Sequence, residues 1–191
     1  MNLNKNNLTG YLRKKKCIGS SEPILDMRQI GDGLKNQIYQ VTTPQQRLMV
    51  KQAHSRVQIK ERWWTDRKRI FAENSCIEIL ANILPPDTFP DALSEDRTNF
   101  VLVTTGPTKD AVVWETELSG GRVDLQIAAQ AGELLAAVHN VTAGQRELKA
   151  MFKDQKAFEQ LRIQPLYESI AGAFPDIQKQ VESRAKELMK P

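Results

Sequence analysis

The pattern of apolar and polar positions divides the chain into a strand-rich first half and a helical second half. Short apolar runs bounded by turn residues predict strands at about 24–31, 37–42, 47–53 and 100–104. The segment before them, residues 2–16, has an amphipathic pattern and predicts a short helix with a basic end, which residues 19–23 interrupt. We therefore expect an α+β protein whose first half is an antiparallel sheet.

A long helix is predicted between the third and fourth strands, from about residue 65 to residue 84, where two prolines end it. Its apolar stripe consists of Ile70, Ile77, Leu80, Ala81 and Leu84. Glu73 falls within this stripe, and a carboxylate on a packing face needs a cation because an unpaired buried charge is costly. Lys51 on the third strand is the predicted partner. The alternative is that Glu73 lies at the edge of the stripe and reaches water.

The second half reads as helix after the Thr104-Thr105-Gly106-Pro107 segment. Helices are predicted at 124–139, 146–160 and 165–173, with a last one beginning at Pro175. The first of them places Ala128, Gly132, Leu135 and His139 on one stripe, and we interpret His139 as a core histidine. The predicted division is therefore an N-terminal helix and linker (1–23), a sheet lobe (24–106) and a helical lobe (107–191).

A glycine-containing stretch carries the candidate chemistry. Gly31, Asp32, Gly33 and Asn36 lie between two predicted strands, where they can adopt positive φ and expose backbone N–H groups. Lys51 lies at the end of the next strand, and alternation places it on the same face as Met49. This combination can hold a polyphosphate. The alternative is an ordinary hairpin with a surface lysine.

Composition narrows the function classes only slightly. The 191 residues suit one domain or two small ones, and 40% apolar residues allow a packed core. No apolar run can span a bilayer, and the basic N-terminus lacks the apolar segment of a secretory signal, so we expect a cytoplasmic protein. Cys17 and Cys76 lack metal or redox spacing and are expected to be free thiols. A net charge of +4 suits nucleotides and nucleic acids equally.

A nucleic-acid-binding module is one alternative, because basic residues and tryptophans are interleaved before and within the long helix. These residues are Arg56, Lys60, Arg62, Trp63, Trp64, Arg67, Lys68 and Arg69. Their other interpretation is a solvated helix face with the tryptophans packed on the sheet.

Four segments together resemble a known family, the kinase-like small-molecule phosphotransferases that include methylthioribose kinase, choline kinase and aminoglycoside phosphotransferases. The segments are Ile30-Gly31-Asp32-Gly33-x-x-Asn36-x-Ile38-Tyr39-x-Val41, Val50-Lys51, Asp66-Arg67-x-x-Ile70-x-x-Glu73 and Ala131-Gly132-Glu133-Leu134-Leu135-Ala136-x-Val138-His139. They occur in the family's order. The resemblance implies a protein-kinase-like small lobe, a sheet with one long helix, followed by the first helices of an incomplete large lobe.

The resemblance also implies a role for each candidate residue, with ATP and Mg²⁺ as cosubstrate and cofactor and a hydroxyl of a small molecule as acceptor. Gly31 to Asn36 would cover the phosphates, Lys51 would contact the α- and β-phosphates, and Glu73 would position Lys51. Ile30, Ile38 and Met49 would bound the adenine. The backbone around Val103, Thr104 and Thr105 would give the adenine hydrogen bonds.

The chain also departs from the family's pattern. Asn36 replaces a third glycine, and the acidic residue expected after the hinge strand is missing. The family's His-Gly-Asp catalytic loop and metal-binding Asp have no counterpart in this sequence, so we expect the catalytic residues beyond Pro191. A chain with half of the phosphate clamp should bind nucleotide weakly and transfer nothing. The alternative is a binding-only pseudokinase that keeps the fold without the chemistry.

Overall fold

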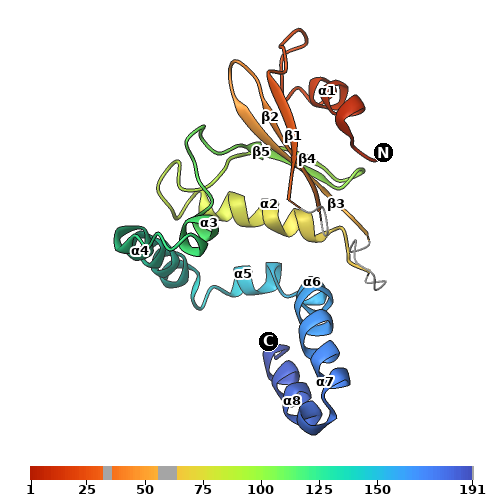
Figure 1. Cartoon of the computed structure of the whole chain (residues 1–191), viewed down its shortest axis with the longest axis vertical. Coiled ribbons are helices and arrows are strands. Elements are labelled where there is room, and N and C mark those ends of the chain that lie inside the picture. The colour runs from red at the N-terminus through yellow and green to blue at the C-terminus, as the bar shows by residue number, and fades with distance from the viewer. Residues whose placement is uncertain (32–35, 56–63, 191) are drawn as a thin grey trace.

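The computed structural model describes residues 1–31, 36–55 and 64–190 and shows an α+β architecture (Figure 1). Its five-stranded antiparallel sheet has the order β1-β2-β3-β5-β4. The strands are β1 (Asp26–Ile30), β2 (Asn36–Thr42), β3 (Arg47–Ala53), β4 (Ala92–Asp96) and β5 (Val101–Thr105). The antiparallel sheet predicted for the first half is confirmed, including the pairing of 37–42 with 47–53.

The strand register decides which side chains share a face of the sheet. Across β2 and β3, Ile38 lies opposite Lys51, Gln40 opposite Met49 and Tyr39 opposite Val50. Because side chains alternate along a strand, Tyr39 and Val50 belong to one face and the other two pairs to the opposite face. The predicted common face of Met49 and Lys51 is therefore confirmed.

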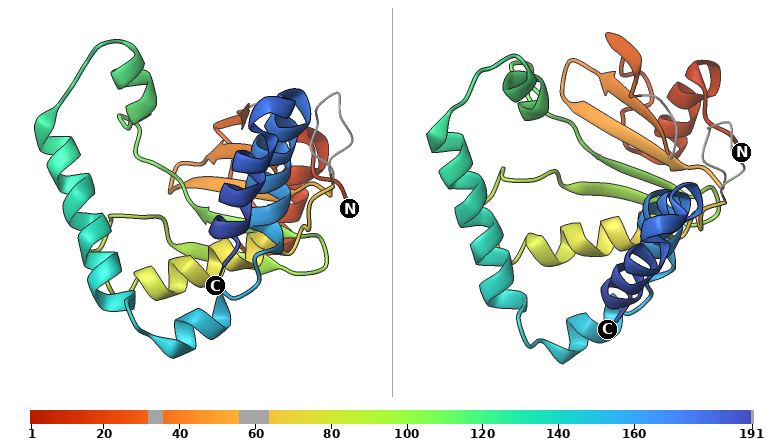
Figure 2. Two further views of the ribbon diagram at one scale, coloured as in Figure 1. Left: turned by 90° about the horizontal axis from the view of Figure 1, so that it is seen from below. Right: turned by 60° about the horizontal axis from the view of Figure 1, so that its bottom comes forward.

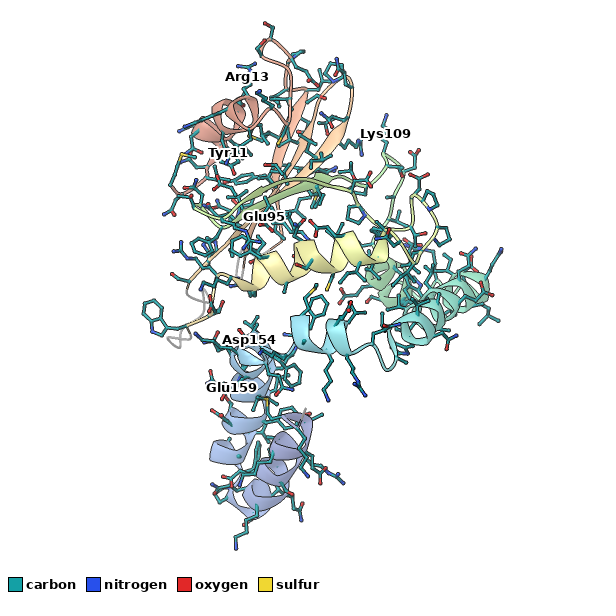
Figure 3. All side chains as sticks on the ribbon, turned by 180° about the vertical axis from the view of Figure 1, so that it is seen from behind. Tyr11, Arg13, Glu95, Lys109, Asp154 and Glu159 are labelled. Carbon is teal, nitrogen blue, oxygen red and sulfur yellow. The ribbon has the colours of Figure 1, made fainter. Side chains whose placement is uncertain are left out.

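Helix α1 (Lys5–Lys14) covers the first face of the sheet. Asn4 caps the helix, since its side-chain oxygen accepts hydrogen bonds from the backbone N–H groups of Asn6 and Asn7. Figure 3 shows Tyr11 on this helix, on the side of the sheet away from α2. The shared core consists of Leu3, Leu8, Tyr11, Leu12, Cys17, Ile18, Tyr39, Val41, Leu48, Val50, Val101 and Val103. The N-terminal helix thus belongs to the same core as the sheet.

Asp96 connects α1 to the turn between β4 and β5. Its carboxylate accepts hydrogen bonds from the Tyr11 hydroxyl at 3.1 Å and from the Asn99 side chain at 2.9 Å, and it pairs with Lys15 at 2.8 Å. The backbone N–H groups of Thr98 and Asn99 donate to its other oxygen. Burial alone would raise the pKa of Asp96, but these donors outweigh burial and hold the pKa well below its usual range.

Helix α2 (Arg69–Leu80) covers part of the opposite face, towards β4 and β5. Ile70 and Ile77 pack against Ala53 and Leu102, as the stripe predicted, and Asn74 is buried with them. The helix begins later than predicted because Asp66 accepts a hydrogen bond from the Lys68 N–H and forms a turn first. It also ends earlier, at Leu80, and residues 81–84 form turns.

Strand β4 was not predicted from the sequence. Leu93 is its single large apolar residue, and the strand has a polar, half-exposed pattern with an irregular register near Ala92 and Ser94. It lies at the edge of the sheet and pairs with β5 alone. Edge strands can be polar because only one side of their backbone is bonded within the sheet.

Helices fill the second half, as predicted, but their boundaries differ (Figure 2). They are α3 (Trp114–Ser119), α4 (Leu125–Thr142), α5 (Arg146–Met151), α6 (Lys156–Phe158), the π-helix η1 (Glu159–Glu168), α7 (Ser169–Ala173), the 3-10 helix η2 (Pro175–Ile177) and α8 (Gln178–Leu188). The helix predicted at 146–160 is interrupted at residues 152–155, and residues 161–164, which lie between two predicted helices, are helical as well.

The interpretation of His139 as a core histidine is wrong. His139 is exposed, and α4 has no buried residue along its whole length. Ala128, Gly132 and Leu135, which share its stripe, are exposed as well. The periodicity of a helix tells which residues share a face, but whether another element covers that face depends on the tertiary arrangement.

Candidate functional site

The sheet face opposite α1 is partly open. Ile30, Ile38, Met49 and Lys51 on this face are half-buried, whereas Tyr39, Val41, Leu48 and Val50 beneath α1 are buried. The difference arises because α2 packs mainly against β4 and β5. The residues predicted to bound an adenine are therefore gathered on the accessible part of the sheet.

Lys51 and Glu73 form an ion pair on this face. The Lys51 ammonium donates a hydrogen bond to Glu73 Oε1, with 25% of the lysine side chain and 35% of the glutamate side chain exposed. Strand alternation points the lysine towards α2, and the position of Glu73 three residues after Ile70 turns it towards the sheet. The pairing predicted from the sequence is confirmed. Glu73 also reaches water, as the alternative stated, so the ion pair is only partly covered.

The loop before β2 begins at Gly31, whose φ of +74° is the left-handed conformation that glycine adopts without strain. A Cβ placed at Gly31 would meet no atom of the described residues within 4 Å. Asp32 and Gly33 lie outside the described residues. Asn36 begins β2 opposite Ala53.

Arg69 joins the segments around this site, and sequence reasoning had considered it only for nucleic-acid binding. Its guanidinium donates to the Asn36 side chain at 2.7 Å, to the His54 carbonyl at 3.2 Å and to the Asp66 carbonyl at 3.0 Å. It also donates to the Thr65 hydroxyl. Burial lowers the pKa of Arg69, and Asp66 and Glu73 oppose that change. One side chain thus ties the end of the glycine loop to β3 and to the start of α2.

A cavity of about 340 Å³ lies beside Arg69. Asn36 borders it from β2, Arg69 and Glu73 border it from α2, and Leu161 and Arg162 border it from η1. Two links hold η1 and α6 near the start of α2, since the Asp66 N–H donates to Gln160 at 2.8 Å and Lys156 pairs with Asp66 at 3.4 Å. The cavity therefore adjoins the ion pair on the helical side.

The backbone around Val103, Thr104 and Thr105 is less available than predicted. These residues lie within β5, which is bonded to β3 on one side and β4 on the other. The Thr105 N–H donates to the Asp91 carbonyl at 3.0 Å, and the Gly106 N–H donates to the Arg47 carbonyl at 2.7 Å. Two donors expected for an adenine are thus used inside the sheet. The Thr104 side chain, in register with Met49, shares the face of Lys51.

Arg28 and the buried Gln40 are further polar residues of this face that sequence reasoning missed. Arg28 donates two hydrogen bonds to Gln40 Oε1, at 3.2 and 3.0 Å. Gln40 is in register with Arg28 on β1 and with Met49 on β3. Alternation could have found them, since Arg28 is two residues before Ile30 and Gln40 two residues after Ile38.

The described residues of the basic and aromatic cluster differ in their contacts. Trp64 is 63% exposed, so the interpretation that the tryptophans pack on the sheet is wrong for this residue. Arg67 stacks over the Phe100 ring at 3.9 Å and is still exposed, whereas Arg69 is held by the hydrogen bonds given above. Arg56, Lys60, Arg62 and Trp63 lie outside the described residues.

Three further features of the described residues concern metal ligands, thiols and membrane-spanning helices. Among the described residues, no group of three or more His, Cys, Asp or Glu side chains could hold a metal ion. Cys17 is buried and Cys76 exposed, and both are free thiols, as predicted. Within the described parts of the chain, we find no helix whose length and apolar character would let it cross a membrane.

Comparisons of the chain with protein-family models and with curated proteins found no match. The family resemblance drawn from the sequence motifs therefore stays a prediction. The geometry around Lys51, Glu73 and Arg69 is the feature of the molecule that points to a function.

Proposed function

We propose that this chain provides the nucleotide-binding sheet and helix of an ATP-dependent small-molecule phosphotransferase. The observation that carries the proposal is the ion pair between Lys51 on β3 and Glu73 on α2. In kinases, a lysine on the third strand contacts the phosphates and must pair with a glutamate of the following helix. The order of strands and helix along this chain is consistent with that arrangement.

In the proposed site, each residue has a physical role. Lys51 neutralises charge on the α- and β-phosphates, and Glu73 keeps the ammonium directed at them. The lack of a side chain at Gly31 lets the loop approach the phosphates closely, and Arg69 fixes the end of that loop through Asn36. The half-buried Ile30, Ile38 and Met49 offer an apolar surface to the base.

The chemistry in this proposal is phosphoryl transfer to a hydroxyl. The hydroxyl oxygen bonds to the γ-phosphorus, and its proton passes to the carboxylate that serves as catalytic base in such enzymes. The bond between the γ-phosphorus and the β–γ bridging oxygen breaks, and ADP leaves with negative charge that Lys51 counters. Neither His54 nor His139 begins a His-x-Asp motif, so no residue of this sequence is assigned the role of that carboxylate. Among the described residues there is no ligand set that would hold Mg²⁺, so this proposal assigns no step to the ion. A binding-only pseudokinase is the second candidate, because it requires the same nucleotide site without the motif.

The test is direct observation of weak nucleotide binding. Saturation-transfer difference NMR on the full chain should show transfer to the ATP ribose and adenine protons, with a Kd of about 0.1–1 mM, or about −4 to −5.5 kcal/mol. At an ATP concentration near this Kd, Lys51→Ala should reduce the transfer about fivefold or more, because its Kd should be at least about tenfold higher. Lys68→Ala removes an exposed lysine near the start of α2 and is the matched control, which should bind ATP like the wild type.

Two results would contradict the proposal. One is the absence of transfer from ATP to the folded wild-type chain. The other is equal binding by Lys51→Ala and Lys68→Ala, because ATP would then contact some other basic surface. If ATP binds as expected, reading the coding sequence past residue 191 for a His-Gly-Asp segment would separate the enzyme from the pseudokinase.

A further inference from the structure

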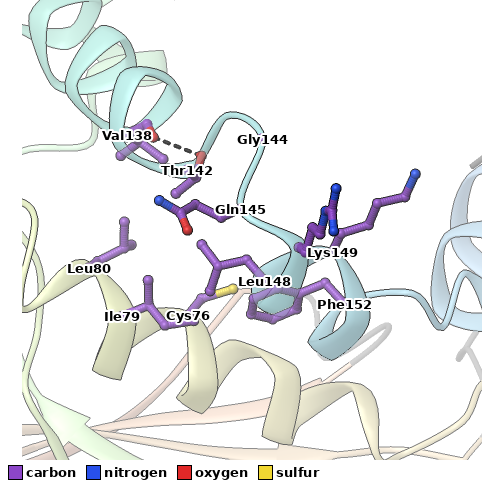
Figure 4. A pocket seen from close by; sticks show the side chains of 11 residues that line it. Cys76, Ile79, Leu80, Val138, Thr142, Gly144, Gln145, Leu148, Lys149 and Phe152 are labelled. Atoms are coloured by element: carbon purple, nitrogen blue, oxygen red, sulfur yellow. Dashed lines mark hydrogen bonds between the residues drawn. The ribbon is translucent and has the colours of Figure 1, made fainter.

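An apolar cavity of about 500 Å³ lies on the side of α2 that faces α4 and α5 (Figure 4). Its volume falls within the range of about 300–1,000 Å³ found for small-molecule pockets. Ile79 and Leu80 come from α2, Val138 from α4, and Leu148 from α5. These side chains are half-buried, so the walls of the cavity are formed but accessible. The nucleotide site proposed above does not use this cavity.

The charged residues that line the cavity are both positive. Arg146 and Lys149 are its two charged lining residues, and no acidic side chain is among the described residues that line it. Figure 4 shows the Lys149 side chain extending away from Ile79 and Leu80, so the ammonium lies at the outer side of the cavity. An apolar interior with cations at its margin is complementary to a molecule with an apolar body and one negative group.

We propose that this cavity binds a small amphipathic acid, an aromatic or aliphatic body bearing a carboxylate or sulfonate. The body lies between α2 and α5, and the acid group lies beside Arg146 and Lys149. Gln145 also borders the cavity and offers the acid an amide donor. This proposal is independent of nucleotide binding at Lys51.

Cys76 allows the binding to be located. Its thiol lines the cavity and is exposed, whereas Cys17, the second cysteine, is buried in the core beneath α1. Burial, and then the nearby Glu73, raise the pKa of the Cys76 thiol, so the reaction with N-ethylmaleimide is best followed at about pH 8.5. Any ligand in the cavity will slow this reaction.

The first experiment uses 8-anilinonaphthalene-1-sulfonate as the probe with the full chain. Its fluorescence should increase on binding, and at ten times its Kd it should slow modification of Cys76 about tenfold, since only the free fraction reacts. Cys76→Ala gives the background from Cys17. A fluorescence increase without protection of Cys76 would place the probe elsewhere, for example on the exposed apolar side chains of α4, and would overturn the proposal.

The second experiment tests recognition of the acid. Arg146→Glu combined with Lys149→Glu should weaken binding of the sulfonate probe about tenfold, whereas the neutral N-phenyl-1-naphthylamine should bind both proteins alike. Lys5→Glu combined with Lys109→Glu makes the same charge change at exposed positions that do not line the cavity, and should bind the sulfonate normally. Equal weakening in both double variants would show a net-charge effect and contradict the site. Equal affinity of the cavity variant and the wild type would contradict it as well.

Discussion

The ion pair between Lys51 and Glu73 gives the most direct test of the reasoning, through a double-mutant cycle. The variants are Lys51→Ala, Glu73→Ala and the combination of both. Each single change removes one charge and leaves the other on a partly covered sheet face, where side chains are 25% and 35% exposed. Urea unfolding of the four proteins gives the coupling free energy between the two residues.

The expected magnitude follows from the exposure of the pair. Two unit charges about 4 Å apart near a protein surface attract by about 4 kcal/mol before the cost of desolvation is considered. Fully exposed pairs retain only about 0.2–1 kcal/mol of net stabilisation. Because both side chains are mainly covered and yet reach water, we expect a coupling of about 1 kcal/mol, near the top of that range.

The same variants connect the pair to nucleotide binding. A lost charged hydrogen bond to phosphate costs about 1.5–3 kcal/mol, so Lys51→Ala should raise the Kd for ATP about tenfold to hundredfold. Glu73→Ala should raise it about fivefold, by the coupling free energy alone. Glu73→Gln keeps the size of the side chain and should resemble Glu73→Ala if charge is what matters.

The double-mutant cycle also needs a control pair of residues and a result that would contradict the expected coupling. Lys68 comes just before α2 and Glu133 lies on α4, so Lys68→Ala and Glu133→Ala should show no coupling. A coupling between Lys51 and Glu73 below about 0.3 kcal/mol is indistinguishable from additivity. It would refute the claim that the lysine is held by the glutamate, even if ATP still bound.

Three further predictions follow from other contacts. Arg69→Lys should lower the free energy of unfolding by about 2 kcal/mol, because one ammonium cannot donate to acceptors in several directions. A free energy of unfolding, measured with urea, within about 0.5 kcal/mol of the wild type would contradict this, because an ordinary surface substitution has an effect of that size. Because the folded pKa of Asp96 is depressed, its contribution to stability is present above its unfolded pKa of about 4 and is lost as the pH falls towards the folded value. Chemical unfolding between about pH 2 and pH 6 should therefore show a steeper acid loss in the wild type than in Asp96→Asn, and parallel curves would exclude this role. The 191-residue chain should give no phosphorylated product from labelled ATP, Mg²⁺ and a panel of amino alcohols, aminoglycosides and thioribosides, because each missing electrostatic group costs about 10² to 10³ in rate. A phosphorylated product that forms with the wild type and does not form with Lys51→Ala would contradict this prediction.

Local pattern was sufficient to find the ion pair before the structure was known. Alternation along β3 fixes the face of Lys51, and the helical repeat fixes that of Glu73 relative to Ile70. Each rule acts over a few residues, and once α2 packs on the sheet through Ile70 and Ile77, the two faces meet. The antiparallel order of β1 to β3 was predictable for the same reason, since short turns join neighbouring strands.

Other parts of the site depended on contacts between distant residues. Arg69 is one of several basic residues in its segment, and nothing in the spacing distinguishes it from Arg67. Only the fold brings Asn36 and His54 to its guanidinium and places Arg67 over the Phe100 ring. The polar edge strand β4 was missed because its pattern resembles a loop, and its conformation is stabilised by pairing with β5.

The sequence by itself determined the elements and which side chains share a face: an antiparallel sheet, a helix carrying Glu73, and a helical second half. The tertiary structure alone decided which faces are covered. It buried one face of the sheet under α1, left Ile38 and Met49 partly open on the other, and exposed the stripe of α4 that contains His139. The physical reason is that dihedral preferences and periodicity are local, whereas burial requires two surfaces to be brought together. The apolar and polar pattern of one surface is the same whether or not another element covers it.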